Sequence, residues 1–149
     1  MTRVARGTPA CPGLMLGLVR GGSCAGVALR LAAAQREHEL ELLWHLEMVD
    51  DAYRPVWVRA QTALGRIHAI AFVANPLHRR YALPMNDGDA ARMVARARGQ
   101  FGLCIEYVSN TVSHLRGMGI SDVRLTRIGA LAAEFASGGQ SASPVENGR

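Results

Sequence analysis

The sequence predicts an α+β domain whose sheet is antiparallel or mixed. Apolar residues alternate in two pairs of short runs, and four other stretches have the spacing or the caps of helices. The predicted order is strand, strand, helix, strand, strand and then three helices, whereas a doubly wound sheet would alternate strands with helices. With 149 residues and 49% apolar content, one domain with one core is expected.

The first predicted element is a hairpin. Two apolar runs, residues 14–18 and 25–31, flank a Gly21-Gly22-Ser23 cluster that is typical of a turn. In the second run the apolar residues alternate, as they do in a strand with one buried face. We therefore expect two paired strands between residues 14 and 31.

A helix is predicted over residues 35–48. Leu40, Leu43 and Trp44 are spaced so that they lie on one side of a helix, and charged residues fill many of the other positions. The next position of this apolar stripe, seven residues after Leu40, is occupied by Glu47. An acidic residue thus stands where a leucine would be expected.

A second hairpin is predicted next, because apolar residues alternate over 56–64 and again over 67–73. The turn between the two runs is expected at Gly65-Arg66. The stretch 75–87 contains two prolines and has little periodicity, so it is predicted to be a loop. Asn86 or Asp87, at its end, can cap a helix.

Three helices are expected to complete the domain, which we predict to span residues 1–136. The first covers 89–98 and ends at Gly99. The second covers 104–116, and Asp122 caps the third. The residues expected to face inward on the last two helices are Tyr107, Val108, Thr111, Val112, Leu115, Leu125, Ile128, Leu131 and Phe135. The tail 137–149 is rich in Gly, Ser, Gln and Asn and is predicted to be disordered.

Composition and residue spacing argue against several classes of protein. The three cysteines are far apart and form no CxxC pair, so they indicate reduced thiols of a cytoplasmic protein rather than a zinc site, and we expect no metal. The net charge of +5 comes from arginines without interleaved aromatic residues, which does not favour nucleic-acid binding. No apolar run is long enough to cross a membrane.

Two interpretations of Glu47 follow from its position. It can lie at the end of its helix and face solvent or pair with Arg54, which is the commoner situation for such a residue. Alternatively it is a functional acid, because a carboxyl group in apolar surroundings can both accept and donate a proton near neutral pH.

Three further residues have a functional and a structural interpretation. Arg54 can bind a substrate carboxylate, or it can neutralise the neighbouring Asp50 and Asp51. Tyr53, next to it, shares the same turn. Tyr107 is on the predicted inward side of its helix, where most tyrosines are core residues with one polar contact.

Several segments, taken together and in order, resemble the ChaC-like gamma-glutamylcyclotransferase family. The resemblance covers about residues 6–131 and extends over most of the chain. The segments that carry it are Arg6-Gly7-Thr8-Pro9, Pro12-Gly13-Leu14, Gly21-Gly22-Ser23-Cys24, Leu43-Trp44, Glu47-Met48, Ala52-Tyr53-Arg54-Pro55, Phe101-Gly102 and Glu106-Tyr107.

The resemblance implies a function, a fold and site residues. Enzymes of this family cleave gamma-glutamyl amides, glutathione in particular, into 5-oxoproline and an amine, without a cofactor. The family's fold is a mixed, partly closed β-barrel flanked by helices. Its catalytic glutamate corresponds to Glu47, and its tyrosines correspond to Tyr53 and Tyr107, with Arg54 beside the first of them.

The sequence departs from the family pattern at its start. Family members begin with a strand and a Tyr-Gly-Ser-Leu loop that holds the gamma-glutamyl group, and this tetrapeptide occurs nowhere in the chain. We therefore expect the N-terminal strand of the fold to be missing. The alternative function is a truncated, non-catalytic binding or regulatory homologue, and the oligomeric state is left open, with a monomer expected for a full-length protein.

Overall fold

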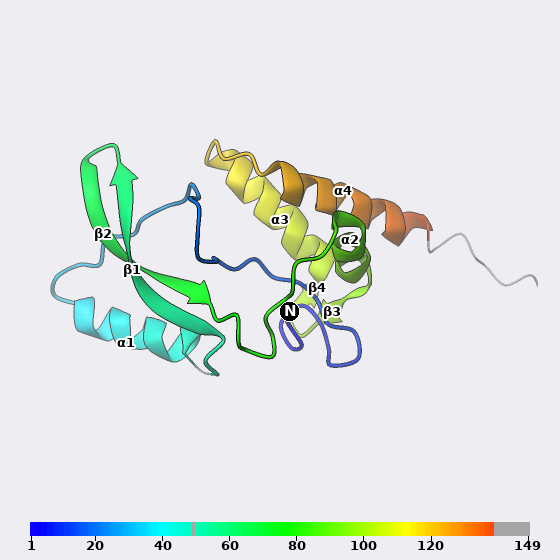
Figure 1. Ribbon diagram of the computed structural model, residues 1–149, viewed down its shortest axis with the longest axis horizontal. Coiled ribbons are helices and arrows are strands. Elements are labelled where there is room, and N and C mark those ends of the chain that lie inside the picture. Colours follow the sequence, from blue (N-terminus) through cyan, green and yellow to red (C-terminus); the bar gives the residue numbers. More distant parts are fainter. Residues whose placement is uncertain (49, 139–149) are drawn as a thin grey trace, which may run out of the picture. The chain divides into compact units, whose positions relative to one another are not determined.

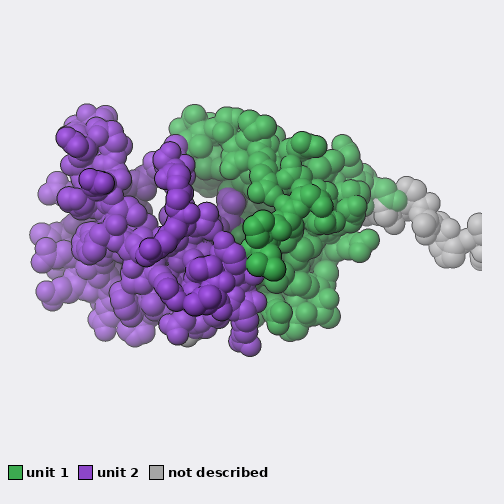
Figure 2. Space-filling model, viewed as in Figure 1, with its two compact units in different colours: residues 1–15, 82–149 green, residues 16–81 purple. Residues whose placement is uncertain are grey.

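The computed structural model describes residues 1–48 and 50–138 (Figure 1). They belong to two compact units, one formed by residues 1–15 and 82–138 and the other by the described residues from 16 to 81 (Figure 2). One unit combines a single helix, and the other combines three helices, with a two-stranded antiparallel sheet, which confirms the α+β class. Neither sheet closes into a barrel within the described part of the chain.

The unit of residues 16–81 contains one helix and one hairpin. Helix α1 (Arg36–Glu47) matches the predicted helix, and β1 (Tyr53–Thr62) pairs with β2 (Gly65–Ala74) as the second predicted hairpin. The turn lies at residues 63 and 64, just before the predicted position, and Gly65 completes it with a φ of 116°. This left-handed conformation favours glycine because a Cβ would clash there.

The first predicted hairpin is wrong. Residues 14–31 form no regular strand, and within them only Leu18 pairs, through a parallel bridge to Val73 of β2. The amide of Ala74 donates to the Leu18 carbonyl at 2.8 Å. Alternation alone does not make a strand, because a strand also needs a neighbour for its backbone groups, and the second run lacks one in this structure.

The other unit is built from three helices and a small hairpin. Its elements are α2 (Asp87–Arg96), β3 (Arg98–Gly99), β4 (Gly102–Leu103), α3 (Cys104–Gly117) and α4 (Val123–Gly138). Their apolar faces enclose one core, formed by Ala91, Val94, Ala97, Cys104, Val108, Leu125 and Ala132. The inward faces predicted for the last two helices are confirmed at Val108 and Leu125, whereas Phe135 is 42% exposed. Its ring lies beside the Arg92 guanidinium, 5.2 Å from ring centroid to Cζ.

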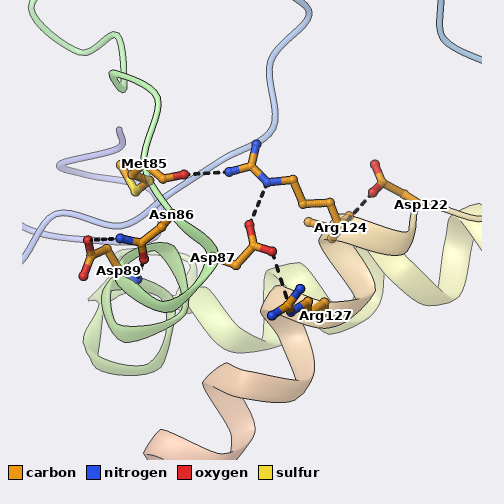
Figure 3. Close-up of polar contacts among 8 residues, drawn as sticks. Met85, Asn86, Asp87, Asp89, Asp122, Arg124 and Arg127 are labelled. Atoms are coloured by element: carbon orange, nitrogen blue, oxygen red, sulfur yellow. Dashed lines mark hydrogen bonds and ion pairs between the residues drawn. The ribbon is translucent and has the colours of Figure 1, made fainter.

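The start of α2 is fixed by polar contacts (Figure 3). The Asn86 side chain accepts a 2.8 Å hydrogen bond from the Asp89 amide, which confirms the predicted cap. Asp87 forms ion pairs with Arg124 and Arg127 of α4, and Arg124 also donates to the Met85 carbonyl. The Asp122 side chain caps α4 in turn, accepting from the Leu125 amide at 2.8 Å.

Two predicted boundaries differ from the structure. Helix α2 begins at Asp87 and ends at Arg96, two residues before the predicted end, because Arg98 pairs with Leu103 in the small hairpin. Helix α4 continues to Gly138, and residues 139–149 of the predicted tail lie outside the described residues. None of the helices described is long and apolar enough to cross a lipid bilayer.

A tight turn at the N-terminus packs against the small hairpin. Thr2 and Gly13 exchange backbone hydrogen bonds of 2.8 and 2.9 Å. A Cβ on Gly99 of β3 would lie 2.4 Å from the Gly7 nitrogen and 2.4 Å from the Val4 carbonyl oxygen. This contact is therefore possible only for a residue without a side chain.

Candidate functional site

The predicted site residues are divided between the two units. Glu47, Tyr53 and Arg54 belong to residues 16–81, and Tyr107 belongs to the other unit. Glu47 is the last residue of α1 and is half-buried. The apolar stripe before it is only partly covered, since Leu40 is half-buried and Trp44 is 52% exposed. Within the described residues Glu47 forms no ion pair, so the predicted alternative of pairing with Arg54 is not realised.

A buried amide fixes the turn that separates Glu47 from β1. The side chain of Asn75 donates to the Asp51 carbonyl at 3.0 Å and accepts from the Leu77 amide at 3.2 Å, while its backbone amide donates to the Ala52 carbonyl. Asp51 has a φ of 57°, a left-handed conformation that Asp tolerates better than most residues. The loop after β2 thus holds the turn that leads into Tyr53.

An ion pair between Asp50 and Arg80 ties the same two segments together. Burial alone would raise the pKa of Asp50, but the hydrogen bond and the positive charge of Arg80 outweigh it, so the pKa lies below its ordinary value of 3.8. Asp50 is therefore neutralised by Arg80. Arg54, which was expected to do this in the structural interpretation, forms no ion pair in the described part of the chain and is exposed.

Tyr53 and Arg54 open β1 and project to opposite faces of the hairpin. Successive side chains of a strand alternate, so Tyr53 shares a face with Trp57, and Arg54 shares the other with Val56 and Val58. Tyr53 is half-buried, and a Cβ on Gly17 would lie 3.9 Å from its ring. A ligand on one face of the hairpin would therefore contact one of these two side chains and not both.

Tyr107 lies on the first turn of α3 and packs against the core of its unit. The Arg6 guanidinium lies near its ring, 5.8 Å from Cζ to the centroid, and Arg6 Nη1 donates to the Leu103 carbonyl at 3.2 Å. Thr111 donates to the Tyr107 carbonyl at 2.7 Å. Tyr107 is thus a half-buried phenol whose ring is held between a core and a cation.

The thiol of Cys104 is buried beneath the N-terminal segment. It donates to the Leu14 carbonyl at 3.1 Å and accepts from the Leu14 amide at 3.4 Å. Burial raises the pKa of Cys104, although the Leu14 hydrogen bond and the charge of Arg6 act in the opposite sense. This thiol stays neutral and serves in packing. Among residues 1–48 and 50–138, no three His, Cys, Asp or Glu side chains are grouped so that they could hold a metal ion.

Sequence reasoning missed the residues that position this region. Asn75 could have been found, because a polar residue that follows an apolar strand and precedes Pro76 is typical of a structured turn. The pairing of Asp50 with Arg80, thirty residues later, has no local signal. The contact of Arg6 with α3 bridges about a hundred residues and has none either.

A family model and solved structures match this chain. The sequence model of the family described as ChaC-like protein matches residues 1–134. A crystal structure of the selenomethionine-labelled gamma-glutamyl cyclotransferase specific to glutathione from yeast superposes with a TM-score of 0.72 at 15% identity, covering 91% of this chain and 81% of that one. A second crystal structure of the yeast enzyme gives a TM-score of 0.69 at 15% identity and covers 83% of its chain. Among curated proteins no sequence matches this chain.

Proposed function

Because this chain belongs to the ChaC-like protein family, we propose that it is a gamma-glutamylcyclotransferase that cleaves glutathione into 5-oxoproline and cysteinylglycine. The observation that carries this proposal is the family match over residues 1–134. The fold shared with the glutathione-specific enzyme from yeast supports it. The half-buried position of Glu47 at the end of α1 supports its assignment as the carboxylate of this reaction.

The proposed reaction is intramolecular. The α-amine of the gamma-glutamyl group attacks its own γ-carbonyl carbon, a five-membered lactam closes, and the amide bond to cysteine breaks. Such a step mainly requires the substrate to be held in a folded conformation. Glu47 accepts a proton from the attacking amine and donates it to the leaving nitrogen, so the enzyme ends the cycle unchanged.

The candidate substrate-binding residues in this proposal are Tyr53, Arg54 and Tyr107, and the first two are alternatives for a ligand that lies on one face of the hairpin. Arg54 is exposed and forms no ion pair in the described structure, so its guanidinium is available for a substrate carboxylate. Because Tyr53 and Arg54 project to opposite faces of the hairpin, Tyr53→Phe and Arg54→Gln should affect turnover unequally. The variant with the larger rise in KM identifies the face that binds substrate.

The direct test of the chemistry is Glu47→Gln. The purified protein should release 5-oxoproline and cysteinylglycine from glutathione, and Glu47→Gln should lower kcat at least about a hundredfold, because it removes the proton acceptor but keeps the shape. Glu41→Gln, the same change at an exposed position of the same helix, is the matched control and should leave kcat unchanged. Full activity of a folded Glu47→Gln variant would refute the assignment of Glu47.

One observation keeps the non-catalytic alternative in view, namely that the chain contains no Tyr-Gly-Ser-Leu segment. A binding or regulatory homologue would bind glutathione or a partner without turnover. Isothermal titration with glutathione, run beside the assay on the 149-residue chain and on a version extended at its N-terminus with such a segment, separates the two functions. Turnover by either version supports the enzyme, and binding without turnover by both supports the alternative.

The finer expectations on architecture and location belong to the same proposal. The family resemblance and the composition favour a partly closed β-barrel around β1 and β2, a single domain over residues 1–136, and a cytoplasmic, bacterial protein. The three cysteines are free thiols, which fits a reducing compartment. A monomer is expected for a full-length protein, and sedimentation of the active protein tests this.

A further inference from the structure

We infer that Arg6 is a positioning residue that fixes the ring of Tyr107 for its role in substrate binding. The effect of Arg6 on turnover rests on the proposed function, since that function gives Tyr107 a substrate to bind. The contact itself comes from the structure, in which the Arg6 guanidinium lies 5.8 Å from the centroid of the Tyr107 ring.

A hydrogen bond and close packing hold Arg6 at this place. Its Nη1 atom donates to the carbonyl of Leu103, the residue that caps α3, at 3.2 Å. Gly102 leaves room for this arrangement. A Cβ added to Gly102 would lie 3.2 Å from Arg6 Nη1 and 3.1 Å from Glu106 Oε2, so both side chains pack against a residue that has none. Arg6 is half-buried, which strengthens its interaction with the π-face of the ring.

The backbone that carries Arg6 is fixed as firmly as its side chain. The Thr2 hydroxyl accepts from the Ala5 amide at 3.1 Å, and the Val4 and Ala5 carbonyls accept from the amides of Gln100 and Phe101 at 2.8 and 2.9 Å. The N-terminal turn is thereby attached to the small hairpin just before α3. A rigid backbone, an anchored guanidinium and a ring in the core together restrict Tyr107 to one orientation.

This restriction has a functional consequence because small displacements of a positioning group are costly in intramolecular reactions. Arg6 does not contact the reacting atoms in this inference and acts only through Tyr107. Removing the guanidinium leaves the phenol in the core but removes one of the contacts that restrict its ring. The loss of turnover should therefore depend on the presence of Tyr107.

The test is a double-mutant cycle on glutathione turnover combined with fluorine NMR. Arg6→Met should lower kcat/KM roughly tenfold, the loss expected for a partly desolvated cation–π contact. In the Tyr107→Leu background the same change should cause no further loss. Arg6→Lys, which keeps a cation without the planar fork, should lie between, and Arg3→Met, an exposed arginine of the same turn, should behave like the wild type.

Fluorine NMR separates this inference from the proposed function. The chain has three tyrosines, so 3-fluorotyrosine gives few resonances, and Tyr107→Leu assigns the one of interest. Arg6→Met should shift and broaden that resonance while the far-ultraviolet circular dichroism is unchanged. An unmoved resonance overturns the inference whatever the assay shows, and so does an equal loss of turnover in both tyrosine backgrounds. Absence of turnover in both the 149-residue chain and its extended version refutes the proposed function and leaves the inference to be decided by the resonance.

Discussion

Different interactions stabilise the interior of each of the two units. Residues 1–15 and 82–138 enclose a core of seven buried apolar residues that α2, α3 and α4 share. Among the described residues from 16 to 81, only Val73 and Asn75 are buried. That unit depends on the pairing of β1 with β2 and on the polar contacts of Asn75 and Arg80.

This difference assigns different tasks to the units. The proposed acid, Glu47, is in the unit with little buried apolar surface, and Tyr107 is in the unit with the packed core. Substitutions in the packed unit should mainly change the free energy of unfolding. Substitutions around Glu47 should mainly change local order and turnover, because less apolar burial depends on them.

The largest expected effect comes from a pair of glycines, one in each unit. Gly99→Ala should lower the free energy of unfolding by about 3 kcal/mol, because its Cβ would meet backbone atoms that cannot move aside easily. The nearest of these atoms, the Gly7 nitrogen and the Val4 carbonyl oxygen, would lie 2.4 Å from the new Cβ. Gly26→Ala, for which nothing lies within 4 Å, should change it by less than about 0.5 kcal/mol. Urea unfolding followed by circular dichroism measures both, and equal effects would contradict the contrast between the units.

A pair of valines tests the cores themselves. Val94 is 1% exposed, and Val94→Ala should cost about 2 kcal/mol through lost apolar burial and the cavity left behind. Val58 on β1 is only half-buried, so Val58→Ala should cost less than about 1 kcal/mol. The same unfolding experiment applies, and a larger cost at Val58 would show that the hairpin buries more apolar surface than this structure gives it.

The polar support of the hairpin is tested at Asn75. Asn75→Ala removes the bonds to the Asp51 carbonyl and the Leu77 amide, and should cost about 1.5 kcal/mol because two partly buried hydrogen bonds are lost. Asn86→Ala, which removes the cap of α2, should cost about 1 kcal/mol in the other unit. Hydrogen exchange should become faster in β1 and β2 for the first variant and in α2 for the second. The reverse pattern would contradict this assignment.

The smallest expected effect is a pH dependence of the unit that contains Glu47. The pKa of Asp50 is lowered in the folded protein, so its contribution is present above the ordinary value of 3.8 and is lost as the pH falls through the lower folded value. The pair is partly exposed, so the amount is at most about 1 kcal/mol. Both tryptophans, Trp44 and Trp57, lie in this unit, so their fluorescence reports its unfolding. Asp50→Asn should remove this part of the acid dependence, and an unchanged profile would contradict it.

Local patterns predicted much of the fold. Helix α1 and the β1–β2 hairpin follow from the spacing of apolar residues, and the caps at Asn86 and Asp122 were found from residue type alone. These features depend on neighbours a few residues away, which a sequence displays directly. The same reasoning placed strands in residues 14–31, where the alternation is real but no partner strand is available in the described chain.

The candidate site was predictable only in part. Glu47 was identified by its place in the stripe of α1 and, separately, by the family resemblance, and its role stays a proposal that the Gln variant tests. Tyr53 and Arg54 were predicted together, yet strand geometry sends them to opposite faces. Asn75, Arg80 and Arg6 were not predicted, since their partners lie 24, 30 and 97 residues away.

By itself, then, the sequence determined the α+β class, most of the helices, one hairpin and the carboxylate at the end of the first helix. Only the tertiary structure decided that, within residues 14–31, Leu18 alone pairs with β2, that Arg80 neutralises Asp50 and that Arg6 lies against Tyr107. The physical reason is the separation of the partners along the sequence. Periodicity and caps arise within a few residues, whereas edge pairing and ion pairs depend on which distant segments the folded chain brings together.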